Sequence, residues 1–167
     1  MIQVYTGEGK GKTTAAFGLA LRALGAGLRV YVAQFIKNGS FCEIKTIKTL
    51  KNIEIEQFGL GCFIRQTPSE KEMKLVSKGF AKIKKIISEK FYDVIILDEA
   101  NIVLDLKMIN LADFLNSIKS ASKNKEIILT GRNAPKELIR LADLVSEIKE
   151  IKHYYKKGIK ARKGIEF

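Results

Sequence analysis

The feature that most constrains this chain is a glycine-rich turn that joins a strand-like run to a helical pattern near the first residue. The apolar run Ile2–Tyr5 is followed by Thr6–Thr14, whose letters are TGEGKGKTT. Glycines let backbone N–H groups curl around phosphate oxygens, a lysine supplies a fixed positive charge, and the hydroxyl after it can hold Mg²⁺. The sequence therefore predicts a phosphate-binding loop that opens a helix.

This loop departs from its usual form at the first corner. The common pattern is G-x-x-x-x-G-K-[ST]. Counting back from Gly11 puts Thr6 at the first position, and Gly7 comes one residue later. A kinase or ATPase is the ordinary interpretation of such a loop. The altered corner indicates an unusual way of holding the nucleotide.

The length and the cysteines limit the class of protein. A chain of 167 residues suits one domain, residues 1–167. The sequence has no apolar run near the roughly 18–20 residues that cross a bilayer. Strand-like sequence begins at once, so we expect no signal peptide. Cys42 and Cys62 form no C-x-x-C pair, which argues against a cysteine metal site or a disulfide framework and favours a cytoplasmic location.

The net charge of +12 raises the question of nucleic acid as a partner. However, the lysines are spread through every predicted helix, and no RNA- or DNA-binding motif accompanies them. A small anionic substrate would be favoured by the same field. We therefore expect no membrane partner and treat a nucleotide-dependent nucleic-acid-binding module as a minor alternative.

Strand-like and helix-like segments alternate along the chain, which favours an α/β fold with a doubly wound, mostly parallel sheet of the phosphate-loop NTPase type. Helices are expected from Lys12 to about Leu24, from the Ser69 and Glu72 capping box to about Lys90, after Asn110, and after Pro135. The strand at residues 53–58 is expected near an edge of the sheet. The predicted strands are Ile2–Tyr5, Val30–Phe35, Ile53–Phe58, Val94–Leu97, Ile127–Thr130 and Leu144–Ile151.

The second strong signal is a pair of carboxylates, Asp98 and Glu99, directly after the buried run at residues 94–97. The carboxyl ends of parallel strands share one edge of the sheet with the phosphate loop. A carboxylate there can hold Mg²⁺, which neutralises a polyphosphate. Alone, the pair could simply cap the next helix. With Gly-Lys-Thr upstream, metal binding is the favoured interpretation.

Two further positions carry weaker signals. Arg132 follows another buried strand within Thr130-Gly131-Arg132, where its planar fork would suit phosphate oxygens, although a surface arginine in a turn fits equally well. His153 is the only histidine, and its surroundings do not make it a convincing general base.

Much of the chain resembles one family, the ATP:corrinoid adenosyltransferases, whose fold is a variant of the phosphate-loop NTPases. The loop form T-G-x-G-K-G-K-T-T, unusual for a kinase, is typical of that family. The resembling segments occur in family order and run nearly from end to end: Tyr5–Gly18, Val32–Lys37, Leu97–Glu99, Thr130–Arg132, Leu141–Glu147, Ile151–His153 and Gly164–Phe167.

The resemblance implies a reaction in which a Co(I) corrinoid attacks C5′ of the ATP ribose, forms a cobalt–carbon bond and expels the whole triphosphate. Such chemistry needs no protein nucleophile or general base, because the reduced substrate is itself the nucleophile. The protein must align C5′ with cobalt, exclude water and stabilise the leaving triphosphate.

Carried onto this chain, the resemblance gives each loop residue a role toward ATP. Lys12 would neutralise the triphosphate, while Thr13 and Glu99 would bind Mg²⁺ and act with Lys12 as the catalytic set. Asp98 would support the metal directly or through water. The full set of expected ATP contacts is Thr6, Gly7, Glu8, Gly9, Lys10, Gly11, Lys12, Thr13, Thr14 and Arg132.

The corrinoid side departs from the family pattern. Relatives place a Gly-Phe-Thr-Trp-like segment over the lower face of the corrin, but this chain has no tryptophan. A straight alignment puts Cys62 and Ile64 at the aromatic places, with Phe63 between them, and a shift by one residue would put Phe63 at the first of these places. We expect these three residues, with Phe35 and Lys37, to face the corrinoid. The competing interpretation is that residues 62–64 fill the core beneath a loop.

Closure of the site and the remaining partners follow from the same resemblance. Some relatives carry an N-terminal extension that covers the site, and this sequence begins without one. We therefore expect closure by a partner subunit, because the family commonly forms homodimers, or by the loop at residues 39–41. A separate reductant must supply Co(I) from Co(II).

Overall fold

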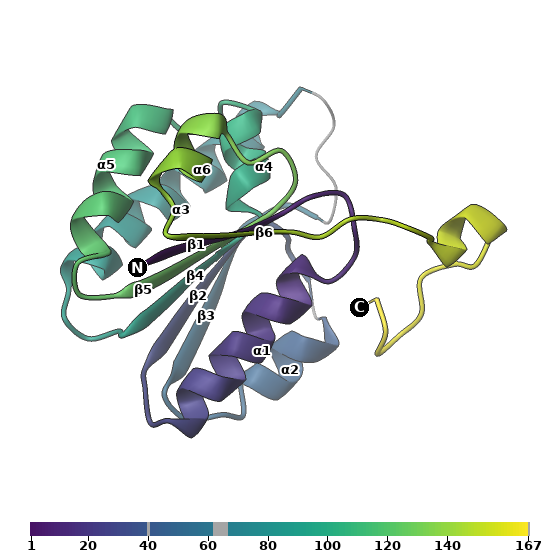
Figure 1. The fold of residues 1–167 in the computed structure, drawn as a ribbon, viewed down its shortest axis with the longest axis horizontal. Coiled ribbons are helices and arrows are strands. Elements are labelled where there is room, and N and C mark those ends of the chain that lie inside the picture. The colour runs from purple at the N-terminus through teal and green to yellow at the C-terminus, as the bar shows by residue number, and fades with distance from the viewer. Residues whose placement is uncertain (40, 62–66, 167) are drawn as a thin grey trace.

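The chain forms a parallel sheet with helices on both faces in a computed structural model that describes residues 1–39, 41–61 and 67–166 (Figure 1). The described residues form six strands, ordered β3-β2-β4-β5-β1-β6, and every neighbouring pair is parallel. The predicted doubly wound α/β fold is therefore confirmed. The strands are β1 (Ile2–Thr6), β2 (Val30–Ile36), β3 (Ile53–Gly59), β4 (Val94–Asp98), β5 (Glu126–Thr130) and β6 (Leu144–Glu147).

The two faces of the sheet are covered by different helices because alternate strand residues point to opposite sides. Val30 and Val32 of β2 pack in one apolar cluster with α1 (Lys12–Gly25). Tyr31 and Phe35 pack in the other cluster with α3 (Glu70–Ser88). Figure 1 shows α1 and α2 (Cys42–Ile47) on one side of the sheet. The other side carries α3, α4 (Ala100–Asp105), α5 (Leu111–Ala121) and α6 (Lys136–Leu141).

The helix starts follow the capping residues in the sequence. The Ser69 hydroxyl accepts a hydrogen bond from the Glu72 backbone N–H, and the Glu72 carboxylate accepts one from the Ser69 backbone N–H, so the capping box is present. The Asn110 side chain caps α5 by accepting a hydrogen bond from the Asp113 backbone N–H. The helix α3 ends at Ser88, two residues before the predicted end, and β3 lies at an edge as expected.

The last strand is shorter than predicted. It covers Leu144–Glu147, whereas the sequence indicated a strand to Ile151. Its partner β1 ends at Thr6, where the phosphate loop turns away, so the ladder has no continuation. Ile148 instead accepts a hydrogen bond from the Gly9 N–H, 2.7 Å from N to O. Beyond this point the chain becomes a tail, residues 148–166, which includes the short 3₁₀ helix η1 (Tyr154–Lys157).

This tail leaves the sheet beside β6 and returns toward the first turn of α1 (Figure 1). It therefore approaches the carboxyl ends of the strands, where folds of this type bind ligands. The short elements α2, α4 and η1 were not predicted from the sequence.

Candidate functional site

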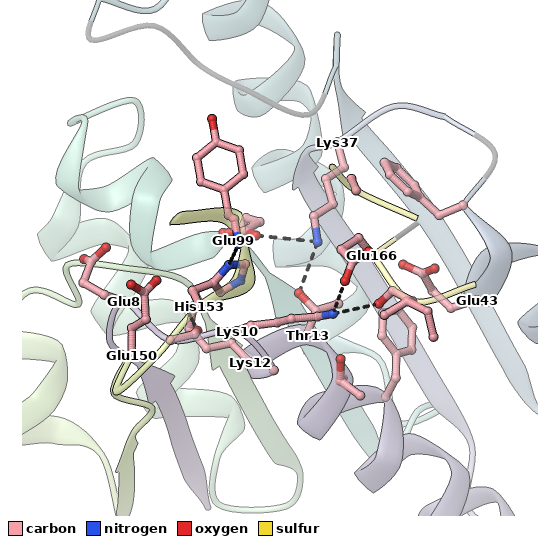
Figure 2. Close-up of a pocket in the computed structure, with 18 of the residues that line it drawn as sticks. Glu8, Lys10, Lys12, Thr13, Lys37, Glu43, Glu99, Glu150, His153 and Glu166 are labelled. Atoms are coloured by element: carbon pink, nitrogen blue, oxygen red, sulfur yellow. Dashed lines mark hydrogen bonds and ion pairs between the residues drawn. The ribbon is translucent and has the colours of Figure 1, made fainter. Parts of the chain in front are cut away.

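A cavity of about 1010 Å³ lies at the carboxyl edge of the sheet (Figure 2). It is bounded by the phosphate loop, the start of α1, the ends of β2 and β4, the start of α2, and the tail. Its charged lining residues are Glu8, Lys10, Lys12, Lys37, Glu43, Glu99, Arg132, Glu150 and Glu166. Its apolar lining includes Phe17, Ile36, Phe41, Ile102, Ile159 and Ile165.

The loop requires its glycines. Gly11 has φ 119°, in the left-handed region, and precedes α1. A Cβ on Gly7 or Gly9 would lie 2.5 or 2.8 Å from the Ile148 carbonyl oxygen, which is too close for any side chain. In the described part of the chain, the first turn of α1 carries neither a side-chain cap nor an acidic residue. Its N–H groups and positive dipole end are therefore available to a phosphate.

Lys12 is held inside the loop. Its Nζ donates to the carbonyl oxygens of Gly7 and Gly9, at 2.7 Å each. Burial lowers the pKa of Lys12 from its ordinary value. The amine is thus anchored where the loop would surround a phosphate, as the motif predicts.

The first charged cluster is buried and centres on a carboxylate at the end of β4. We call it the Asp98 cluster: Thr13, Gln34, Lys37, Asp98 and Thr130. Asp98 is 0% exposed and accepts from every other member. The distances are 2.8 Å from Thr13 Oγ1, 3.0 Å from Gln34 Nε2, 2.8 Å from Lys37 Nζ and 2.6 Å from Thr130 Oγ1.

The two neighbouring carboxylates have different electrostatic surroundings. Burial alone would raise the pKa of Asp98, but the Lys37 charge and the hydrogen bonds hold it below its ordinary value. Burial and the adjacent Asp98 charge raise the pKa of Glu99. Burial alone would lower the pKa of Lys37, yet Asp98 and Glu99 raise it. Asp98 is therefore the carboxylate with a fixed charge.

Neither carboxylate acts as a helix cap. Glu99 occupies the N-cap of α4 with φ 61°, but its side chain makes no capping hydrogen bond among the described residues. Its carboxylate instead lies 3.5 Å from Lys37 Nζ. This strained left-handed conformation turns Glu99 toward the cavity that it lines.

The oxygens in this corner suit a magnesium ion that also binds phosphate. Thr13 Oγ1, Asp98 and Glu99 are hard oxygen donors from α1, β4 and the start of α4. In the described residues no group of three or more His, Cys, Asp or Glu side chains could hold an ion without other ligands. The donor set therefore fits Mg²⁺, which typically takes one or two carboxylates together with substrate phosphates.

The other residues predicted to bind ATP are partly gathered here. Glu8, Gly9, Lys10, Gly11, Thr14 and Arg132 line the cavity. Arg132 is paired with Glu8, 3.2 Å between Nε and Oε2. Thr6 is used by the scaffold, because its hydroxyl accepts from the Ala134 N–H at 3.4 Å.

The predicted corrinoid residues are less clearly placed. Phe35 is 0% exposed and packs against Phe58 in the core, with ring centroids 6.2 Å apart. Lys37 lines the cavity, but its ammonium lies in the Asp98 cluster. Cys62, Phe63 and Ile64 lie outside the described residues. The corrinoid role of all five stays a prediction.

A second charged cluster was missed by sequence reasoning. We call it the Glu166 cluster: Lys10, Tyr154, Arg162 and Glu166. Lys10 Nζ donates to Glu166 at 2.7 Å and to the Tyr154 hydroxyl at 2.8 Å, and the Tyr154 hydroxyl donates to Glu166. The Arg162 N–H donates to Glu166 at 2.6 Å. The tail is thus fastened to the phosphate loop, as Figure 2 shows for Lys10 and Glu166.

One sequence signal for this cluster was available. Glu166 is the only acidic residue after Glu150 in a strongly basic segment.

His153 has a local role, because its Nδ1 accepts from the Tyr155 N–H at 3.1 Å and caps η1. Phe41 lines the cavity, and the tail contributes more of its wall, while closure by residues 39–41 stays a prediction.

The fold and the site define the class: a phosphate-loop protein built to bind a nucleotide at the carboxyl edge of a parallel sheet. The family model described as ATP:corrinoid adenosyltransferase BtuR/CobO/CobP matches residues 1–167. The chain is 34% identical to a corrinoid adenosyltransferase of Sinorhizobium sp., covering 100% of this chain and 80% of that one. It is 30% identical to the corrinoid adenosyltransferase of Escherichia coli K12, covering 100% and 85%. The chain therefore belongs to the ATP:corrinoid adenosyltransferase family.

Among solved structures, the flagellar accessory protein FlaH of Methanocaldococcus jannaschii is similar in fold, with a TM-score of 0.56. The match covers 87% of this chain and 69% of that one at 17% sequence identity. This likeness supports the fold alone.

Proposed function

We propose that this chain transfers the 5′-deoxyadenosyl group of ATP to the Co(I) of a corrinoid and releases triphosphate. The observation that carries the proposal is that the phosphate loop and Glu99 line one cavity, with Asp98 buried directly behind Thr13, in a chain that belongs to the family over its full length. Family membership favours this activity over a kinase or ATPase and over a nucleic-acid-binding module.

The proposed step is a substitution at carbon. Cobalt attacks C5′ with its electron pair, the Co–C bond forms, the C5′–O bond breaks, and its electron pair leaves with the triphosphate. Because the corrinoid substrate is the nucleophile, the protein has to position the partners and stabilise the leaving charge.

The phosphate loop supplies that stabilisation. The backbone N–H groups at the start of α1 and the Lys12 ammonium would hold the triphosphate, and Thr14 and Arg132 would add contacts from the cavity wall. We further propose that Thr13, Asp98 and Glu99 hold Mg²⁺ beside it. When bound, the ion would neutralise part of the polyphosphate charge.

The cavity, at about 1010 Å³, is at the upper end of the range of about 300–1,000 Å³ that is usual for small-molecule sites. Its apolar lining and the tail would limit water near reduced cobalt. In the described part of the chain, none of the helices is long and apolar enough to cross a membrane. We also propose that the enzyme is cytoplasmic, forms a homodimer and depends on a separate reductant that converts Co(II) to Co(I).

Product analysis tests the proposal. Protein, ATP, Mg²⁺ and chemically reduced cobalamin should yield triphosphate and a light-sensitive alkylcobalt product. Release of ADP would contradict adenosyl transfer.

Lys12→Ala should lower kcat/KM by at least about 100-fold, because the leaving triphosphate loses a fixed charge in a water-poor site. Lys149→Ala removes an equal charge from a side chain that is 74% exposed and serves as the control. Near-normal turnover by Lys12→Ala would exclude the proposed role of Lys12.

A further inference from the structure

Lys37 already places a positive charge where the proposed metal ligands meet. Its Nζ lies 2.8 Å from Asp98 Oδ2, 3.1 Å from Thr13 Oγ1 and 3.5 Å from Glu99 Oε1. Figure 2 shows the Lys37 side chain reaching down to Thr13 and Glu99. The three oxygens that fit Mg²⁺ are thus the oxygens that surround this ammonium.

A tight backbone turn at Ile36 directs the Lys37 side chain toward Thr13, Asp98 and Glu99. Ile36 has φ 67°, and the Lys37 N–H donates to the Phe35 carbonyl oxygen at 2.6 Å. This is a γ-turn with a β-branched residue in the left-handed region, a rare and strained conformation. The turn packs on Gly59, where a Cβ would collide with the Ile36 backbone. Strain of this kind persists where the surrounding structure enforces it.

An ammonium and a divalent ion would not share these oxygens. Mg²⁺ needs oxygen ligands at about 2.0–2.1 Å, close to octahedral. Lys37 Nζ already takes hydrogen-bonding positions on Thr13 and Asp98 and faces Glu99. Placing both cations against the same three oxygens would bring two like charges together in a largely buried corner, where such repulsion is weakly screened.

We propose that the Lys37 ammonium is a resident counter-ion that occupies the metal site of the nucleotide-free protein and withdraws when the divalent ion enters. The inference rests on the metal site in the proposed function. It means that Asp98 and Glu99 stay charge-compensated in both states. The freed ammonium remains on the wall of the cavity that would hold the anionic triphosphate. The metal then binds well only together with the nucleotide, which offers the displaced lysine a new partner.

The test is a Mn²⁺ titration without nucleotide. Binding is measured as the loss of the free Mn²⁺ signal in electron paramagnetic resonance. Lys37→Met should bind Mn²⁺ at least about tenfold more tightly than the unaltered protein, because the competing charge is gone. Lys37→Arg, which keeps a cation, should bind as weakly as the unaltered protein. Lys149→Met is the matched control for net charge, because its ammonium pairs with Glu147 on the surface.

A second measurement uses the unaltered protein, so it does not depend on the folding of a variant. Trace acetylation read by mass spectrometry should find the Lys37 amine more reactive as Mn²⁺ saturates the site, with Lys149 as the internal reference. Equal Mn²⁺ affinities for all the proteins, or unchanged Lys37 reactivity at saturation, would overturn the inference and leave the metal site standing. Failure of both the unaltered protein and Lys37→Met to bind Mn²⁺ would overturn the metal site as well.

Discussion

The Asp98 cluster and the Glu166 cluster lie at the same cavity and are both built on a lysine–carboxylate pair, but they differ in exposure. Asp98 is 0% exposed and the Lys37 side chain is 17% exposed. In the Glu166 cluster, the Lys10 side chain is 40% exposed and the Glu166 side chain is 16% exposed. The same pairing of an ammonium with a carboxylate therefore occurs once in a buried, low-dielectric corner and once at a more exposed position that solvent screens.

Because of this difference in exposure, breaking the two ion pairs should have different consequences. Breaking a buried ion pair leaves a charge without a partner and destabilises the whole fold. Breaking an exposed pair changes mainly the local freedom of the segment that it fastens. We therefore expect the Asp98 cluster to govern stability and metal binding, and the Glu166 cluster to govern how firmly the tail covers the phosphate loop.

The largest effect should come from Asp98→Ala. Removal of this carboxylate leaves the Gln34 amide without its acceptor and takes away the nearest charge partner of the Lys37 ammonium. The free energy of unfolding should fall by about 3–5 kcal/mol, measured by urea denaturation. Glu166→Ala is the matched variant in the exposed cluster and should change unfolding far less.

The double variant Asp98→Asn/Lys37→Met sharpens the measurement, because it removes both charges at once. It should recover part of the stability lost in Asp98→Asn alone. Equal losses for Asp98→Ala and Glu166→Ala would remove the distinction between the clusters.

Glu99→Gln should have the next largest effect, on metal rather than on stability. The variant keeps the shape of the side chain but removes a negative charge from the proposed metal corner. The Mg²⁺ concentration for half-maximal turnover should rise by about tenfold or more. Glu43→Gln is the control, because Glu43 lines the same cavity from α2. An unchanged Mg²⁺ titration of Glu99→Gln would count against a role of this carboxylate at the metal.

Much of this architecture could be predicted from local sequence. The run Val30–Phe35 is apolar on both faces because helices cover both sides of the sheet, and the glycine loop specifies its own turn. The loop, Lys12, Thr13, Asp98 and Glu99 could be predicted as site candidates because their spacing and their places after strands are local properties.

The remaining features depend on contacts that local patterns do not encode. The direction of Lys37 follows from a left-handed turn at Ile36, which the residue type disfavours and which packs closely against Gly59. The bond between Lys10 and Glu166 joins residues 156 positions apart. The shorter β6 likewise reflects where its partner ends rather than its own residues.

The smallest expected effect is on the tail, and Glu166→Gln tests it. The variant loses the charge that pairs with Lys10 while keeping the side-chain shape. Limited trypsin digestion of the basic tail should become up to about fivefold faster, because an exposed pair contributes little. Raising the salt concentration should have the same effect on the unaltered protein and none on the variant. Glu137→Gln, which loses an exposed pair with Arg140 in α6, is the control.

Acidification extends this last comparison with a defined sign. The hydrogen bond from Lys10, with those from Tyr154 and Arg162, holds the pKa of Glu166 below its ordinary value. A depressed pKa means that the stabilisation of the tail is complete above the ordinary glutamate pKa, about 4.3, and is lost only as the pH falls further. Protection from an acid-active protease should therefore stay constant from pH 7 to about pH 5 and then decline in the unaltered protein. The same decline in Glu166→Gln would show that another group titrates, and would contradict the proposal that the Glu166 carboxylate holds the tail.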